Sequence, residues 1–210
     1  MQNRGVLAIV SGFSGAGKGT VMKALMNKYD NYALSISATS RAPRPGEMEG
    51  REYFYKSVEK FEKMIAEDEL IEYAQYVGNY YGTPKAYVEK MLNEGKDVIL
   101  EIELQGAMKV KAKMPDTVLI FITPPTADEL KKRLVGRGTE DEATIDARLK
   151  RAAEEAEYMD SYDYLLINDV LEDCVDSLHE LIQSERLKVS RNIDRIKFIR
   201  EDVKIFSEGE

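Results

Sequence analysis

A glycine-rich run directly after a short apolar segment constrains this chain more than any other feature. Residues 12–20 read GFSGAGKGT and follow the apolar residues 6–10. The apolar run predicts a buried strand, and a helix is expected to begin near Lys18. Backbone N–H groups of such a turn can surround a phosphate, which the N-terminal end of the helix also favours. The predicted phosphate-binding loop contains Gly12, Phe13, Ser14, Gly15, Ala16, Gly17, Lys18, Gly19 and Thr20.

Lys18 places a positive charge where it can reach the β- and γ-phosphates of a nucleoside triphosphate. The next position usually carries a Ser or Thr hydroxyl that binds Mg²⁺, but here it is Gly19, followed by Thr20. We therefore expect Mg²⁺ to be held by phosphate oxygens and waters, with no direct side-chain ligand, since the ion gives up its waters reluctantly. The alternative is a glycine turn without a ligand, and the lysine at this spacing argues against it.

Composition narrows the class of protein. The 210 residues, 43% apolar and 32% charged, suit one globular domain. A net charge of −8 argues against a broad nucleic-acid surface. The sequence has no apolar stretch near the roughly 20 residues of a membrane span, and its N-terminal apolar run is too short for a signal peptide. The single Cys174 excludes an internal disulfide and favours a reducing compartment, so we expect a cytoplasmic protein.

The order of apolar and amphipathic segments predicts an α/β fold with a doubly wound parallel sheet. Expected strands are residues 6–10, 34–38, 98–102, 118–122 and 164–167. Expected helices are residues 18–28, 85–93, 128–135, 141–158 and a segment from 170 onward, and residues 126–129 form a predicted capping box. We expect a single domain, 1–210, with a core of 1–37, 88–130 and 160–210.

Two segments interrupt this alternation. Residues 38–87 are rich in tyrosine and contain a hairpin-turn pattern at 77–79, which predicts a small, mostly β insertion. Residues 131–159 include a short polar stretch with arginines, which is typical of a mobile lid between two helices. We expect both segments to flank the phosphate loop.

The insertion begins with a pattern suited to a second phosphate. Arg41 and Arg44 lie three residues apart in a proline-containing loop and can form a fork for phosphate oxygens. Tyr53 and Tyr81 could add hydroxyl donors. The alternative reading is an exposed basic turn.

Glu72 follows in an apolar and aromatic run, where a buried carboxylate needs a partner. Guanine offers N1–H and an amino group to one carboxylate, and its O6 accepts from a hydroxyl such as that of Ser37 or Thr83. Adenine mismatches both contacts. The alternative is a strand glutamate that faces solvent.

At this point the sequence resembles the guanylate kinase family over nearly its whole length. The matching stretches are GFSGAGKGT, SATSRAPRPGE, GREYF, LIEYAQ, NYYGT, LEIELQG, RLVGRGTED with Arg148 downstream, and the tripeptide Ile167-Asn168-Asp169. The resemblance implies transfer of the γ-phosphoryl group of ATP to GMP with Mg²⁺.

The resemblance also implies roles for individual residues. GMP would be held by Ser37, Arg41, Arg44, Tyr53, Glu72, Tyr81 and Thr83. Glu103 occupies a position where the family usually has Asp, and Phe13 replaces a common proline. Asn168 would contact the adenine of ATP. The residues expected to act in phosphoryl transfer are Lys18, Arg41 and the lid arginines Arg133, Arg137 and Arg148.

Glu101 and Glu103 are expected on one face of a strand end. We interpret them as positioning metal and substrate rather than as acid and base, because the acceptor phosphate of GMP is already ionised. His179 is interpreted as a residue on a helix surface.

Two other functions were weighed. Residues 27–30 match the Asn-Lys-x-Asp pattern of GTPases but lie too close to the loop lysine. A guanylate-kinase-like protein-binding module without catalysis is disfavoured by Lys18 and the lid arginines. Apolar residues of the C-terminal stretch, Leu187, Ile193, Ile196 and Ile199, predict a helix that packs on the core or on a partner subunit of a homo-oligomer.

Overall fold

The core of the protein is a parallel five-stranded sheet. The computed structural model describes residues 4–76, 78–136, 138 and 141–207. The strands are β1 (Leu7–Gly12), β2 (Tyr32–Leu34), β7 (Asp97–Glu101), β8 (Val118–Thr123) and β9 (Tyr164–Ile167), in the order β2-β7-β1-β8-β9. Every neighbouring pair is parallel. The predicted α/β class with a doubly wound parallel sheet is confirmed.

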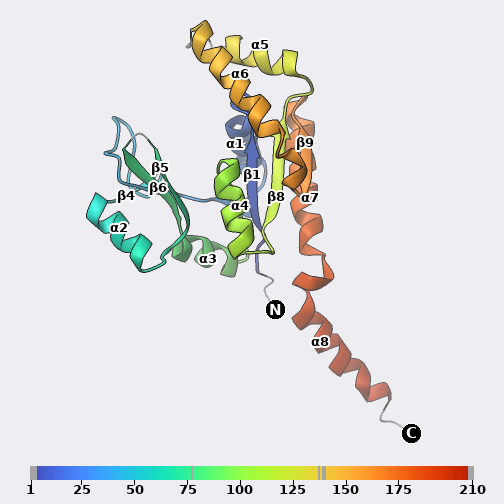
Figure 1. Ribbon diagram of the computed structural model, residues 1–210. Helices are drawn as coiled ribbons and strands as arrows, with labels where there is room; N and C mark the ends of the chain where they lie inside the picture. The colour runs from blue at the N-terminus through green and yellow to red at the C-terminus, as the bar shows by residue number, and fades with distance from the viewer. Residues whose placement is uncertain (1–3, 77, 137, 139–140, 208–210) are drawn as a thin grey trace.

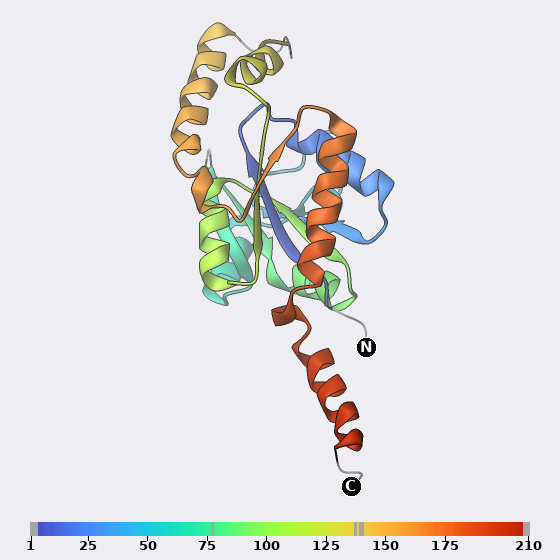
Figure 2. The same cartoon turned by 90° about the vertical axis from the view of Figure 1, so that its right-hand side faces the viewer.

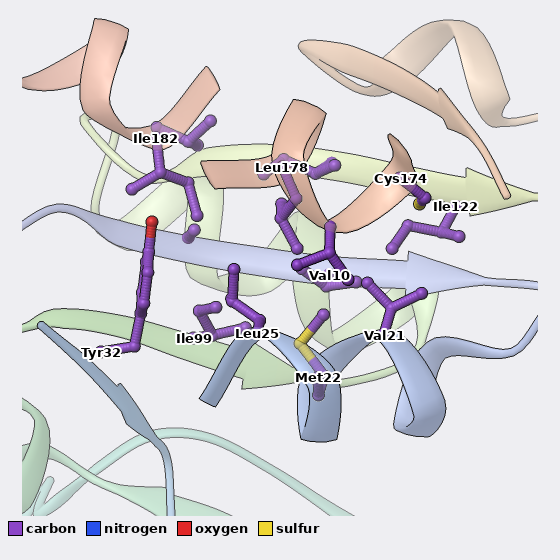
Figure 3. Packing of buried hydrophobic residues seen from close by; sticks show 14 of the residues in the cluster. Val10, Val21, Met22, Leu25, Tyr32, Ile99, Ile122, Cys174, Leu178 and Ile182 are labelled. Atoms are coloured by element: carbon purple, nitrogen blue, oxygen red, sulfur yellow. The ribbon is translucent and has the colours of Figure 1, made fainter. Parts of the chain in front are cut away.

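Helices cover both faces of this sheet (Figure 1). Helices α1 (Lys18–Lys28) and α7 (Leu171–Arg186) pack on one face, and α3 (Lys85–Asn93) and α4 (Leu104–Lys113) pack on the other. Because side chains alternate along a strand, Val10 of β1 joins the first cluster and Ile9 the second. Figure 3 shows Val10 between α1 and α7, with Leu25 and Leu178 directed toward it.

The second sheet belongs to the insertion. It contains β3 (Ala38–Thr39), β4 (Phe54–Tyr55), β5 (Leu70–Tyr76) and β6 (Asn79–Pro84), in the order β4-β3-β6-β5. Phe61, on helix α2 (Val58–Ala66), is fully buried against this sheet. The mostly β insertion therefore also contains one helix that was not predicted. The predicted turn residue Val77 lies outside the described residues.

One predicted strand is wrong in its bounds. Residues 34–38 span the end of β2 and the start of β3, which belong to different sheets. The backbone N–H of Ser35 still bonds to Ile99 O in the core, whereas Ser37 O accepts from Phe54 N in the insertion. The apolar run thus carries the chain from one sheet to the other, which periodicity alone does not reveal.

The other helices follow the predictions closely, with one omission. Helices α1 and α3 have the predicted bounds. Helices α5 (Ala127–Gly136) and α6 (Glu142–Ala156) form the lid region and pack on Phe13 and Phe121. Half of the predicted capping box forms, because Glu129 N donates to Thr126 Oγ1. Helix α4 was not predicted, and a 3₁₀ turn, η1 (Met159–Ser161), follows α6.

The C-terminal segment leaves the body of the molecule. After α7, a short 3₁₀ turn η2 (Val189–Arg191) leads into α8 (Ile193–Asp202) and a further turn η3 (Val203–Phe206). Figures 1 and 2 both show α8 extending away from the sheet. Leu187 is 81% exposed and Phe206 is 83% exposed. The predicted apolar helix is therefore present, but the described part of the chain does not cover it. Within the same residues, no helix combines the length and apolarity needed to cross a membrane.

Candidate active site

The loop between β1 and α1 has the backbone conformation that its glycines predict. Gly12 has a φ of 153°, and a β-carbon there would lie 2.0 Å from Ile122 O. Gly17 has a φ of 87°, and a β-carbon there would lie 2.6 Å from Asn168 Nδ2. A side chain at Gly12 would collide with the backbone of Ile122, and a side chain at Gly17 would collide with the side-chain amide of Asn168. The loop shape thus depends on these two glycines.

Lys18 closes the loop from its C-terminal end. Its ammonium donates to Gly12 O at 2.6 Å and to Phe13 O at 3.1 Å, so the charge lies over the loop. Gly17 is the N-cap residue of α1, and it has no side chain that could accept a hydrogen bond from the N-terminal amides of the helix. These amides and the nearby ammonium are the groups that bind phosphate oxygens at such a site.

Some of the remaining loop residues are buried and pack against the sheet, whereas others are exposed to solvent. Phe13 and Ala16 are buried, and the Phe13 ring packs edge-on against Phe121 at 5.0 Å. Gly15 is also buried, whereas Gly19 and Thr20 are exposed. Phe13 thus fastens the loop to the sheet in the place where the family commonly has a proline. No space constraint surrounds Gly19, since a β-carbon there would have no neighbour within 4 Å among the atoms described.

Asn168 supports the loop from the end of β9. Its side-chain amide donates to Ala16 O at 2.8 Å, and its backbone N–H donates to Thr123 O. The side chain is buried, at 6% exposure. Asn168 thus joins two strand ends to the loop, and its predicted contact with adenine stays a prediction.

A cavity of about 730 Å³ opens beside the loop. Three parts of the chain line it: Lys18 of the loop with Glu103 of the core, Tyr53 of the insertion, and Arg148 of the lid region. The segments are far apart in sequence, and Figure 1 shows the insertion and the α5–α6 pair on either side of the loop end of β1. The cavity can therefore hold a ligand that contacts all three parts at once.

The predicted phosphate fork lies at the insertion side. The Arg41 guanidinium lies 5.4 Å from the centre of the Tyr53 ring, and the Tyr53 ring packs edge-on against Tyr81 at 6.0 Å. Three of the four predicted phosphate ligands are therefore together. The fourth, Arg44, is exposed at the rim of the same turn. The guanidinium of Arg41 is also bound by Glu47, which sequence reasoning did not single out.

Two of the three predicted guanine contacts line a separate small cavity, and the third, Glu72, bonds to one of them. Ser37 and Thr83 both line it, and it shares Glu101 with the large cavity. Thr83 Oγ1 donates to Glu72 Oε1 at 2.8 Å. Burial raises the pKa of Glu72 above its ordinary value, and the Thr83 hydrogen bond opposes that shift in part. Glu72 is thus a buried acceptor, as the guanine hypothesis requires, and not a solvent-facing strand residue.

The two carboxylates at the end of β7 are arranged differently from the prediction. Strand β7 ends at Glu101, and Glu103 precedes α4 as its N-cap residue, so the pair does not continue one strand face. Both still line the large cavity with Lys18. Glu103 Oε2 accepts from Arg151 Nη2 at 2.8 Å, which joins the core to helix α6.

These carboxylates also bear on Mg²⁺. Among the described residues there is no group of three or more His, Cys, Asp or Glu side chains that could hold a metal ion. Carboxylates on the wall of a phosphate-binding cavity do fit an ion that keeps most of its waters, since water-mediated contacts need no tight cage. The donor set is compatible with Mg²⁺ bound through phosphates and waters.

The predicted lid arginines occupy different positions. Arg148, on α6, lines the cavity and donates through Nη1 to Ser14 Oγ of the loop. Arg133, on α5, pairs with Glu129 one turn away at 2.9 Å and is not among the described residues that line the cavity. Arg137 lies outside the described residues. The structure thus brings one lid arginine to the loop.

The GTPase-like tetrapeptide has a structural role instead. Lys28 and Tyr29 both contact Asp176 of α7, and the Tyr29 ring stacks on His179 at 3.7 Å. His179 is therefore half-buried between helices rather than on a free surface, and its Nδ1 lies 2.7 Å from the hydroxyl of Tyr32. None of these residues lines the cavity beside the loop, within the chain as described.

The predictions missed three charged residues at or near the site, Arg151, Glu155 and Glu47, although each left a sequence signal. Arg151 lies three residues after Arg148 and four before Glu155, and all three line the large cavity. Glu47 lies three residues after Arg44, which continues the spacing of the arginine pair. Charged residues at helical or turn spacing from a predicted site residue are the signal that could have identified them.

An α/β sheet that presents a glycine loop and a lysine at the start of a helix is the architecture of phosphate-loop nucleotide-binding proteins, and this chain is one of them. Comparison with known proteins then specifies the family. The sequence model described as Guanylate kinase matches residues 4–185, so the chain belongs to the guanylate kinase family.

Individual relatives agree with this assignment. The guanylate kinase of Latilactobacillus sakei is 50% identical over 198 residues, covering 94% of this chain and 98% of that protein. The guanylate kinase of Oceanobacillus iheyensis is 50% identical over 202 residues, covering 96% and 98%. The crystal structure of guanylate kinase from Anaplasma phagocytophilum has a TM-score of 0.71 at 32% identity, covering 93% of this chain and 94% of that one.

Proposed function

We propose that the protein is a guanylate kinase that transfers the γ-phosphoryl group of ATP to GMP, giving ADP and GDP. The observation that carries this proposal is the buried Glu72–Thr83 pair, whose threonine lines a small cavity that shares Glu101 and Ile102 with the cavity beside the phosphate loop. A phosphate loop alone is common to many nucleotide-binding proteins. A buried carboxylate acceptor in the insertion is the group that a guanine-specific kinase requires in addition.

GMP would lie between the insertion and the core. Glu72 would accept from guanine N1–H and the amino group, while the hydroxyl of Ser37 would donate to O6, because Thr83 already donates its one hydroxyl proton to Glu72. Gly106 on α4 supports this geometry, because even a β-carbon there would come within 3.5 Å of Glu72 Oε2. Glycine at this position therefore leaves room beside that oxygen.

The GMP phosphate would lie toward the large cavity. Arg41, Arg44, Tyr53 and Tyr81 are proposed to bind it, with Arg41 supplying a planar cationic donor. Glu103 of the cavity wall would position the nucleotide or a water. The cation–ring contact between Arg41 and Tyr53 supports a preformed phosphate site.

ATP would bind with its phosphates on residues 12–20 and its adenine near Asn168. Mg²⁺, held through phosphates and waters with Glu101 and Glu103 on the cavity wall, would supply neutralisation of the phosphate charge. The loop amides and Lys18 hold the phosphates, and Arg148 bonds to loop residue Ser14, next to the transferring group. Arg133 and Arg137 are proposed to join it when the lid closes and excludes water. No general base is needed, because the attacking oxygen of GMP is already ionised.

The domain assignment follows from the same reasoning. The core, the insertion of residues 38–87 and the lid of residues 131–159 would act as one body and two arms, with closure driven by the two nucleotides.

The lone Cys174 supports a cytoplasmic location; it is buried, and burial raises its pKa to about 11. A protein-binding module without activity is the alternative, and no feature of the site favours it.

We also infer that the protein forms a homo-oligomer through its C-terminal segment. The family match ends at residue 185, and the exposed apolar side chains beyond it include Leu187, Ile193, Phe198, Ile199 and Phe206. A second copy of the same helix would cover such a row, as in a symmetric dimer. Light scattering of the protein and of an Ile199→Asp variant tests this, and a monomeric parent protein would contradict it.

The central experiment is a nucleoside monophosphate panel. ATP with Mg²⁺ is incubated with GMP, AMP, CMP or UMP, and each diphosphate product is quantified. We expect kcat/KM for GMP to exceed that of every other acceptor by at least about 100-fold. Comparable rates with AMP would contradict the guanine assignment, and no turnover with any acceptor would favour the binding module.

A further inference from the structure

The carboxylate of Glu47 lies at the centre of the turn that carries the two arginines. Its Oε1 and Oε2 both accept from Arg41 Nη2, each at 2.9 Å. Oε2 also accepts from the backbone N–H of Arg44 at 2.7 Å and from the hydroxyl of Tyr55 at 2.9 Å. One carboxylate therefore fixes an arginine side chain, the backbone beside a second arginine and a strand of the insertion.

These contacts require an acceptor-only group. Every partner of Glu47 donates: a guanidinium N–H, a backbone N–H and a phenol O–H. An ionised carboxylate offers acceptor sites on both oxygens, whereas an amide of the same size presents an NH₂ group at one of them. The backbone N–H of Arg44 and the Tyr55 hydroxyl lower the pKa of Glu47, and its bond to Arg41 acts in the same direction. The carboxylate is thus kept ionised by the groups it orients.

Arg41 retains the capacity to bind a second anion while Glu47 holds it. A guanidinium has five N–H donors in a fixed plane. Glu47 engages Nη2, Nη1 donates to Ala42 O at 2.8 Å, and the guanidinium also interacts with the side chain of Tyr81, itself a proposed phosphate ligand. The side chain is 15% exposed and that of Glu47 is 18% exposed, so the pair is mostly shielded from solvent. A long side chain held in this way loses little further rotamer freedom when a phosphate arrives.

We propose that Glu47 is a positioning residue for GMP, which holds Arg41 and the turn of Arg44 in the geometry that receives the acceptor phosphate. The proposal rests on the proposed function, since it assigns the fork to the phosphate of GMP. Glu47 itself does not touch the substrate. Its effect is expected on GMP binding, and not on ATP binding or on the chemical step.

The test is a comparison of two glutamates in the same turn. Glu47→Gln removes the Oε1 contact and directs an NH₂ group at Arg41. Glu52→Gln is the matched control, because Glu52 also accepts from a backbone N–H, that of Met48, and from an arginine, Arg51, which lies outside the proposed fork. We expect KM for GMP to rise about tenfold in Glu47→Gln, with kcat within about threefold and KM for ATP unchanged. Glu52→Gln is expected to stay within about twofold in all three.

Two more variants separate the possible failures. Arg41→Ala tests the fork itself, and unchanged KM for GMP in this variant would refute the proposed role of Arg41 in the function. If Arg41→Ala raises KM for GMP but Glu47→Gln does not, the positioning role is refuted while the function stands. In the double variant, the Glu47→Gln change should add less than about twofold, since the group it orients is gone. Full additivity would contradict the proposal.

A variant with little risk of misfolding completes the set. Tyr55→Phe removes one donor to Glu47 and changes no charge. We expect a two- to threefold rise in KM for GMP, roughly, with kcat unchanged. An equal loss of kcat and of ATP affinity in Glu47→Gln and Tyr55→Phe would show a general structural role and overturn the assignment.

Discussion

The hydroxyl of Thr83 donates to Oε1 of Glu72 across two neighbouring strands, β5 and β6, and both side chains are buried. This bond fixes the carboxylate in a place where water cannot satisfy it. The bond also uses only one of its two oxygens. A guanine edge with two N–H donors can also bind this carboxylate. Glu72 would then accept both from Thr83 of the neighbouring strand and from the base.

The first prediction concerns base selectivity. Glu72→Gln keeps the size of the side chain but turns one acceptor into a donor that faces a guanine N–H. We expect kcat/KM for GMP to fall by about 30- to 1000-fold, which corresponds to about 2–4 kcal/mol. AMP, with an acceptor at N1, should lose much less. Steady-state kinetics with both acceptors measure the ratio, and an unchanged GMP/AMP ratio would make Glu72 a structural residue.

Glu72→Gln is expected to lower activity but not the stability of the protein without nucleotide. Burial raises the pKa of Glu72 above its ordinary value of 4.5, so the folded state binds a proton more readily than the unfolded state. The ionised carboxylate therefore costs stability above the raised pKa, and this cost disappears as the pH falls through it. Without nucleotide, Glu72→Gln should be at least as stable as the parent at pH 7, with a smaller difference at pH 5. Urea unfolding at the two pH values measures this, and a less stable variant at pH 7 would contradict it.

Lys18 is predicted to act in turnover and not in folding. Its ammonium bonds to two loop carbonyls but takes no part in the buried core. Lys18→Ala should reduce kcat by at least ~10²-fold, as expected for the removal of a strong charge-stabilising donor. Far-UV circular dichroism and the midpoint of urea unfolding should match those of the parent. Near-normal turnover would refute the role of the loop in phosphate binding.

Closure of the two arms can be followed by hydrogen exchange. A bisubstrate analogue that links adenosine and guanosine through phosphates should protect the insertion and helix α6 as well as the phosphate loop, because it contacts all three walls of the cavity. ATP alone should protect the loop and α6 but not the second sheet. Protection confined to the loop with the analogue would exclude the two-arm model.

A buried ion pair lies at the start of β7, at the opposite end of that strand from Glu101. Asp97, fully buried at the start of β7, accepts from Arg186 Nη2 at 2.7 Å and from Val6 N at 2.8 Å. Asp97→Ala would leave the arginine without its buried partner and should cost about 3–5 kcal/mol of unfolding free energy. Asp176→Ala, which breaks an exposed pair with Lys28, should cost less than about 1 kcal/mol. Urea denaturation compares the two, and equal losses would contradict the ranking.

Much of the candidate site was predictable because its signals are local. The loop needs Gly12 and Gly17 for its backbone, and the lysine follows directly, so a short run of sequence specifies a phosphate site. Helices α1 and α3 begin and end at the predicted residues, since amphipathic periodicity and the flanking residues act within a few positions. The sequence left open whether Glu72 is buried or faces solvent, and the structure shows it buried.

Other features depend on contacts that sequence spacing does not encode. The predicted strand 34–38 divides between two sheets, because pairing partners far along the chain decide where each residue lies. Helix α4 was missed because its buried residues, Ala107 and Val110, make only a narrow apolar stripe. The Glu47 contacts join residues whose charges could have faced solvent, and the exposed Glu103–Arg151 pair joins two segments far apart in the chain.

The sequence by itself determined that the chain has an α/β core with a phosphate loop, a tyrosine-rich insertion and a charged segment after it. These are consequences of backbone freedom, side-chain alternation and helical periodicity, which act over a few residues. Only the tertiary structure decided which side chains share a cavity. It placed Arg148 at the loop and Arg133 away from the cavity lining, and it left α8 uncovered. The physical reason is that such outcomes depend on packing between segments far apart in the chain, where burial and pairing outweigh local preference.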